Sequence, residues 1–226
     1  EESPEISENE IAQIEWALLP VFRYDKFIPN HLSKFAAKDA SFFAQLVIWA
    51  FRSEKDKKDG RQMDDEMRNK AEASHDLLRK IAILPGDSGG DINADALNVW
   101  VDDARKLLQD ADRVKIGDDQ IGSYLSHSPV GSDGVWPHEA VRSVIERVKS
   151  SQFALAIRIG KQNARGMTSR SPWDGGKQER ILAAQYYNDA KKIELIYPRT
   201  AEILRSIARD YDNEARHQDW DSELHD

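Results

Sequence analysis

The stretch LNVWVDDARKLLQDA, residues 97–111, decides the fold class of this chain. Its apolar residues recur at the steps of three and four that place side chains on one face of an α-helix. We therefore expect an amphipathic helix whose apolar stripe faces the core. The predicted stripe consists of Leu97, Trp100, Val101, Ala104, Leu107, Leu108 and Ala111.

The helical period continues on both sides of this stretch. Ser7 and Glu10, three residues apart, have the spacing of a capping box at the start of a helix. The longest apolar run, FFAQLVIWAF at residues 42–51, is shorter than the about 20 residues that a membrane span needs, and it predicts a buried core element. Further helices are predicted over residues 67–81, 141–148, 182–197 and 201–215.

Strands are not predicted with the same clarity. The one candidate, FALAIRI at residues 153–159, is equally compatible with a short helix. The prediction is an all-α fold, an irregular multi-helix bundle of about seven to nine helices with mostly short connections. Residues 1–226 are expected to form a single helical domain, with a possible subdivision near residues 126–134.

Composition restricts the class of protein. The 226 residues are 40% hydrophobic and 32% charged, with a net charge of −8, which excludes a collagen-like repeat and argues against global disorder. The absence of cysteine excludes thiol catalysis, disulfides and cysteine-ligated zinc, and favours a cytoplasmic location. The N-terminal residues lack the features of a signal peptide. The chain starts at Glu1 without an initiator methionine, which suggests a processed product or a domain excised from a longer protein, and we favour the excised domain.

Charge is unevenly distributed. Residues 147–180 hold eight basic residues and two carboxylates, whereas residues 210–226 hold seven carboxylates and one arginine. Three interpretations are open: the acidic C-terminal helix folds back and neutralises the basic segment, an acidic protein partner binds it, or nucleic acid binds it.

The segment GKQNARGMTSRSPWDGGKQE, residues 160–179, is the least helix-like part of the chain, and long ordered loops are often functional. Its arginines could hold a carboxylate or phosphate, and Gly175-Gly176 precedes a helix whose free N–H groups favour an anion. The alternative is structural, with arginines capping helix carbonyls and a tryptophan filling the core. The candidate binding residues are Lys161, Asn163, Arg165, Arg170, Trp173, Lys177 and Arg180.

Catalytic motifs are not found. The sequence lacks HExxH, GxSxG and a P-loop, and its six histidines show no metal-ligand spacing, so no catalytic residue, metal or cofactor is predicted. One enzyme hypothesis ranks last: Arg165, Arg170 and Lys177 clamp an anionic small molecule while Glu179 acts as base. It lacks a second catalytic group to pair with Glu179.

Four motifs in the C-terminal half carry a resemblance. They are residues 133–142 (DGVWPHEAVR), 163–170 (NARGMTSR), 175–183 (GGKQERILA) and 198–208 (PRTAEILRSIA). Over about residues 130–216 the chain resembles the C-terminal helical accessory region of large multidomain bacterial proteins, some of which look like components of anti-phage or stress systems. The resemblance implies an accessory module and assigns no active-site residue.

The leading hypothesis is therefore a non-enzymatic helical interaction or regulatory domain of a larger cytoplasmic bacterial protein. Its partner would be another protein or other domains of the parent chain, and no membrane contact is expected. A nucleic-acid-binding module using residues 147–180 is the alternative, and the net charge of −8 counts against it. If residues 160–179 bind a partner, the side chains of Arg165 and Arg170 should be exposed. If these residues have a scaffold role, both guanidinium groups should be buried against carboxylates or helix-end carbonyls.

Overall fold

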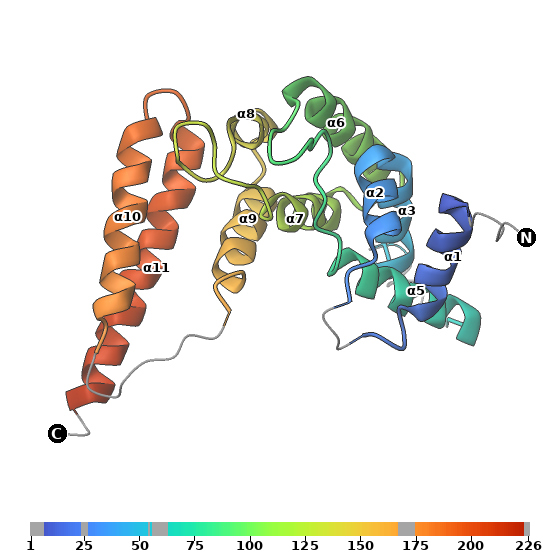
Figure 1. The fold of residues 1–226 in the computed structure, drawn as a ribbon, viewed down its shortest axis with the longest axis horizontal. Coiled ribbons are helices and arrows are strands. Elements are labelled where there is room, and N and C mark those ends of the chain that lie inside the picture. The colour runs from blue at the N-terminus through green and yellow to red at the C-terminus, as the bar shows by residue number, and fades with distance from the viewer. Residues whose placement is uncertain (1–6, 24–26, 54, 56–62, 167–174, 224–226) are drawn as a thin grey trace, which may run out of the picture. The chain divides into compact units, whose positions relative to one another are not determined.

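A computed structural model describes residues 7–23, 27–53, 55, 63–166 and 175–223 of the chain (Figure 1). These residues form ten helices and no strand, so the predicted all-α class is confirmed, while the predicted count of about seven to nine helices is too low. The helices are α1 (Glu8–Leu18), α2 (Asn30–Lys38), α3 (Ala40–Ala50), α5 (Asp65–Leu78), α6 (Ala94–Asp110), α7 (Val114–Leu125), α8 (Glu139–Val148), α9 (Ser151–Asn163), α10 (Lys177–Ile193) and α11 (Pro198–Glu223).

Contacts between residues divide the chain into two compact units. We call Glu1–Tyr124 the N-terminal unit and Leu125–Asp226 the C-terminal unit. The division falls beside residues 126–134, the segment for which the sequence suggested a possible subdivision. Each unit is described by itself.

The N-terminal unit is organised around α3, which packs against α5 and α6, while α1 packs against α2. Five of the eleven α3 residues are buried, and four of them, Phe43, Ala44, Leu46 and Val47, belong to the apolar run 42–51. The predicted capping box begins α1, because the Ser7 side chain accepts the N–H of Glu10 and the Glu10 carboxylate accepts the N–H of Ser7. Neither α3 nor any other helix in the described ranges is long and apolar enough to cross a membrane.

Three aromatic rings meet in the core of the N-terminal unit. The centroid of the Phe43 ring lies 4.9 Å from that of Trp100 and 5.6 Å from that of Tyr124, and none of the three residues is more than 5% exposed. The Trp100 indole N–H donates to the Ala36 carbonyl at 2.9 Å, and the Tyr124 hydroxyl donates to the Ile83 carbonyl. Buried aromatic residues stabilise a core strongly when their polar atoms find partners. The inner face of α6 is thereby fixed against α2 and α3.

The C-terminal unit is built on α10 and α11, which pack together as an antiparallel pair (Figure 1). Their rings stack at Tyr186 and Tyr211, with centroids 5.8 Å apart. Gly176 lets the start of α10 approach α11 closely, because a Cβ atom there would lie 2.3 Å from the Ala215 carbonyl oxygen. The α8 and α9 helices pack against α11 and complete the unit.

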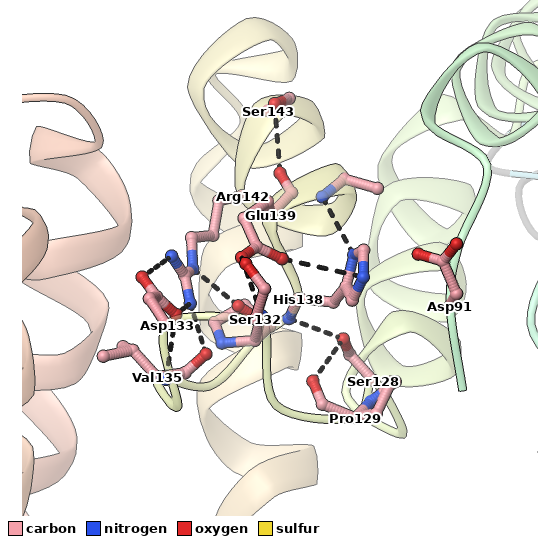
Figure 2. A network of polar contacts seen from close by, with 12 residues as sticks. Asp91, Ser128, Pro129, Ser132, Asp133, Val135, His138, Glu139, Arg142 and Ser143 are labelled. Carbon is pink, nitrogen blue, oxygen red and sulfur yellow. Dashed lines mark hydrogen bonds and ion pairs between the residues drawn. The ribbon is translucent and has the colours of Figure 1, made fainter.

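A buried arginine ties the segment before α8 to that helix (Figure 2). Arg142 is 1% exposed, and its guanidinium donates to both carboxylate oxygens of Asp133, at 2.6 and 2.8 Å. It also donates to the Pro137 carbonyl at 2.6 Å and to the Val135 carbonyl. A charge this deep is tolerated only when it is paired and hydrogen-bonded. Arg142 therefore holds residues 133–137 in one conformation.

A second carboxylate holds the same segment from the first turn of α8 (Figure 2). The Glu139 side chain accepts the backbone N–H of Ser132 at 2.8 Å and the Ser132 hydroxyl at 2.6 Å. Gly131 leaves room for this contact, because a Cβ atom there would lie 2.5 Å from a Glu139 carboxylate oxygen. His138 is the N-cap of α8 and accepts the N–H of Ala140. The approach to α8 is thus fixed by side chains at its own start.

One open alternative is decided by the structure, and one sequence-based expectation needs correction. Residues 153–159, equally compatible with a strand or a short helix in the sequence, are helical and lie within α9. Leu107 was placed in the core stripe of α6 but is 38% exposed, whereas Leu108 is fully buried. Leu107 lies about 100° from Leu108 around the helix axis, at the edge of the apolar stripe, where the core no longer covers it.

We expect Asp133→Asn to destabilise the protein by about 1.5–3 kcal/mol, because it removes the carboxylate, itself 42% exposed, that pairs with the buried Arg142 guanidinium. The matched control is Asp65→Asn, since Asp65 pairs with Arg68 at 2.9 Å while the two side chains are 90% and 58% exposed. Exposed pairs of this kind contribute about 0.2–1 kcal/mol. Urea titration of both variants measures the two losses, and equal losses would contradict the structural role of the Asp133–Arg142 pair.

Acid should remove the same contribution. The hydrogen bond from Arg142 lowers the pKa of Asp133 from 3.8 to about 2. A carboxyl group with a lowered pKa in the folded state stabilises the fold while it is ionised and loses that contribution as the pH falls through the folded pKa. The stability difference between the wild type and Asp133→Asn should be constant above about pH 5 and shrink below about pH 4. Urea midpoints of both proteins, measured across this pH range, test the prediction. A stability difference between them that stays constant down to about pH 2 would contradict it.

Candidate interaction site

The predicted binding segment contains Arg165, which follows α9 and reaches α10 and α11. Its Nη2 donates to Glu179 Oε1 at 2.8 Å, and its Nη1 lies 3.8 Å from Glu214 Oε2. The Arg165 guanidinium also lies 5.2 Å from the centroid of the Tyr211 ring. The side chains of Arg165 and Glu179 are 17% and 0% exposed. This is the arrangement expected if Arg165 is a scaffold residue.

Electrostatics favour the charged form of Arg165 at this place. Burial lowers the pKa of the guanidinium, but the hydrogen bond and the charge of Glu179 raise it, and the net pKa lies above its ordinary value. The ionised guanidinium therefore cross-links α9, α10 and α11.

Carboxylates of α11 also meet other cations of the basic segment. Asp210 lies 3.5 Å from Arg158 and accepts the side-chain amide of Gln162 at 2.7 Å. Asp219 pairs with Arg180. Together with Arg165 and Glu214, these pairs agree with the first of the three charge interpretations, in which the acidic C-terminal helix neutralises the basic segment.

The N-terminus of α10 binds a carboxylate from the same protein, that of Asp219. The Gly176 N–H donates to Asp219 Oδ1 at 2.9 Å, so a carboxylate from α11 occupies the position predicted for a bound anion. This hydrogen bond and the pairing with Arg180 lower the pKa of Asp219. The N-terminus of α10 is therefore used for packing α10 against α11.

The other members of the predicted site lie in different surroundings. The Lys161 ammonium lies 4.7 Å from the centroid of the Trp136 ring, and burial lowers the pKa of Lys161. Asn163, the last residue of α9, and Lys177, the first of α10, are exposed. The remaining two predicted residues, Arg170 and Trp173, lie outside the described residues.

The geometry does not favour the anion-clamp enzyme. A general base has to reach the proton that it abstracts, and the Glu179 side chain is 0% exposed and accepts a hydrogen bond from Arg165. In the described part of the chain, no group of three or more His, Asp or Glu side chains is arranged to hold a metal ion.

The motifs that carry the resemblance form internal contacts of the C-terminal unit. The 133–142 motif contains the Asp133–Arg142 pair, and the 175–183 motif contains Gly176, which lies against α11. In the 198–208 motif, Thr200 donates its N–H and hydroxyl to the Glu146 carboxylate, at 2.8 and 3.0 Å. The physical role of these residues is to hold the helices of the unit together.

A groove of about 970 Å³ lies in the N-terminal unit, between the outer face of α6 and the junction of α2 with α3. Val99 and Leu107 line it and are 62% and 38% exposed, whereas the neighbouring Trp100 is 5% exposed. The groove therefore presents apolar side chains to solvent. Its charged lining residues are Lys38, Asp39, Asp95, Asp103, Lys106 and Asp110.

The groove is not predicted from the sequence, because Leu107 fits the core stripe of α6 and Val99 lies outside that stripe. The sequence does contain a signal, since Val99, Asp103 and Leu107 follow one another at steps of four and share one face of α6. On the opposite wall, Asp39 is the N-cap of α3 and accepts the N–H of Ser41 at 2.8 Å. Its hydrogen bonds with Ser41 lower the pKa of Asp39.

Comparisons of this chain with protein-family models, with curated proteins and with solved structures find no match. The resemblance of residues 130–216 to an accessory region of bacterial proteins stays a prediction. A function for the chain has to be inferred from its own geometry.

We expect Arg165→Ala to destabilise the protein by about 3–5 kcal/mol, because it removes the guanidinium that faces the buried Glu179 carboxylate. Arg180→Ala is the control, since the Arg180 side chain is 51% exposed and should cost about 0.5 kcal/mol. In the double variant Arg165→Ala/Glu179→Ala, part of the loss should be recovered. Urea midpoints measure the stability of all three variants. If Arg165→Ala were as stable as the wild type, Arg165 would not be a scaffold residue and would be available to bind a partner.

Proposed function

We propose that this chain is a non-enzymatic helical interaction module that binds a segment of a partner protein in the α2–α3–α6 groove. The observation that carries the proposal is the exposure of Val99 and Leu107 in a groove of about 970 Å³. Single exposed apolar residues are ordinary on protein surfaces. Apolar side chains gathered in a hollow with polar groups around it are typical of binding sites.

The apolar lining supplies only part of the binding free energy. Complete burial of a Val or Leu side chain contributes about 1.5–3 kcal/mol, and Val99 and Leu107 are already partly covered. A micromolar complex requires about −8 kcal/mol. The partner therefore has to contact the charged walls of the groove as well.

The alternative of nucleic-acid binding through residues 147–180 has less support. Arg158, Arg165 and Arg180 each face a carboxylate of α11, which competes with phosphate for the same guanidinium groups. A mobility shift with duplex or single strands at about 50 mM salt, weakening steeply as salt is added, would favour this alternative over the interaction module.

Selection of peptides from a random library against the whole chain tests the interaction module. We expect recovered peptides whose affinity falls at least about tenfold in Val99→Asp, because the variant places a charge on the apolar surface that the peptide covers. Val21→Asp is the matched control: Val21 is 70% exposed, belongs to the same unit and does not line the groove. Its affinity for the peptides should equal that of the wild type.

Both substitutions are at exposed positions, so their urea midpoints should correspond to changes within about 0.5 kcal/mol. A loss of affinity in Val99→Asp then reports on binding and not on folding. The proposal is overturned if no peptide is recovered, or if the recovered peptides bind Val99→Asp as tightly as the wild type.

A further inference from the structure

We infer that the α2–α3–α6 groove takes a basic amphipathic helix of the partner protein, an inference that rests on the function proposed above. Three features support it: the charge of the groove walls, the spacing of side chains along α6, and the lack of a strand edge among the described residues.

The charge of the walls favours a cationic partner. Carboxylates stand on both sides of the groove, at the α2–α3 junction and along α6, and all of them are exposed. They outnumber the ammonium groups by four to two. The carboxylates are those of Asp39, Asp95, Asp103 and Asp110, and the ammonium groups are those of Lys38 and Lys106. Lysine or arginine side chains of a partner would meet complementary charge, whereas phosphate groups would be repelled.

The spacing of the α6 side chains matches a second helix. Asp95, Val99, Asp103, Leu107 and Asp110 recur at steps of four and three, so acidic and apolar groups alternate along one line of α6. At 1.5 Å per residue, Val99 and Leu107 are about 12 Å apart along the axis. Apolar residues seven or eight positions apart on a partner helix have nearly the same separation, with basic residues between them facing the carboxylates.

The described residues form no strand whose edge an extended peptide could continue. Along the middle of α6 the backbone N–H and C=O groups are bonded within the helix, so this wall of the groove presents side chains. A proline-rich segment needs an aromatic platform, but Trp100 is 5% exposed and its N–H is bonded to Ala36. Recognition of a helix uses side chains alone and is therefore the mode that fits this groove.

The peptides recovered by the library selection, synthesised with a fluorescent label, provide the test. We expect them to be rich in lysine or arginine, to carry apolar residues at helical spacing, and to gain helical circular dichroism on binding. Replacing their basic residues by glutamate should weaken binding at least about tenfold in fluorescence anisotropy. Asp103→Asn/Asp110→Asn should weaken binding about three- to tenfold, while Glu66→Gln, an exposed substitution on α5 outside the groove, should leave it unchanged.

The outcomes separate this inference from the proposed function. Acidic or proline-rich peptides that lose affinity in Val99→Asp overturn the basic helix and leave the interaction module standing. Basic peptides whose affinity is unchanged in Asp103→Asn/Asp110→Asn overturn the inference as well. Failure to recover any peptide that depends on Val99 overturns both.

Discussion

The ion pair between Arg165 and Glu179 determines how the C-terminal unit is put together. Glu179 lies in the first turn of α10 and is 0% exposed, and an ionised carboxylate in that position has to be paired. Arg165 supplies the pairing charge from the end of α9 and also approaches Glu214 on α11. Because α9 and α10 each pack against α11, the pair forms only when these three helices are assembled.

The need to pair charged groups also explains why the charged residues of the C-terminal half do not form an open binding site. Asp219 of α11 accepts the Gly176 N–H at the start of α10 and pairs with Arg180, so the chain itself supplies an anion to the helix end. Asp133 similarly satisfies the buried guanidinium of Arg142. Charged groups that suggest ligand binding in the sequence are bound to one another, and for the buried members, Arg142 and Glu179, burial without a partner would cost several kcal/mol.

In the N-terminal unit, adjacent residues of α6 face in different directions, one toward the core and the next toward the surface. Trp100 and Leu108 point inward and are at most 5% exposed, whereas their neighbours Val99 and Leu107 point into the groove. The rotation of about 100° between consecutive helical residues separates the two sets. A helix with two apolar lines can pack against its own unit and still offer a surface to a partner.

The sequence by itself determined the features that depend on residues a few positions apart. The all-α class, the capping box of Ser7 and Glu10, and the inward face of α6 through Trp100 and Leu108 all follow from helical spacing. Whether Arg165 would meet a partner or a carboxylate was decided by tertiary structure, because Glu179 is fourteen residues away and reaches it only when α9 and α10 both pack against α11. The presence of the groove was likewise decided by tertiary structure. A stripe indicates which side chains share a face, but the exposure of Leu107 depends on which helices cover that face.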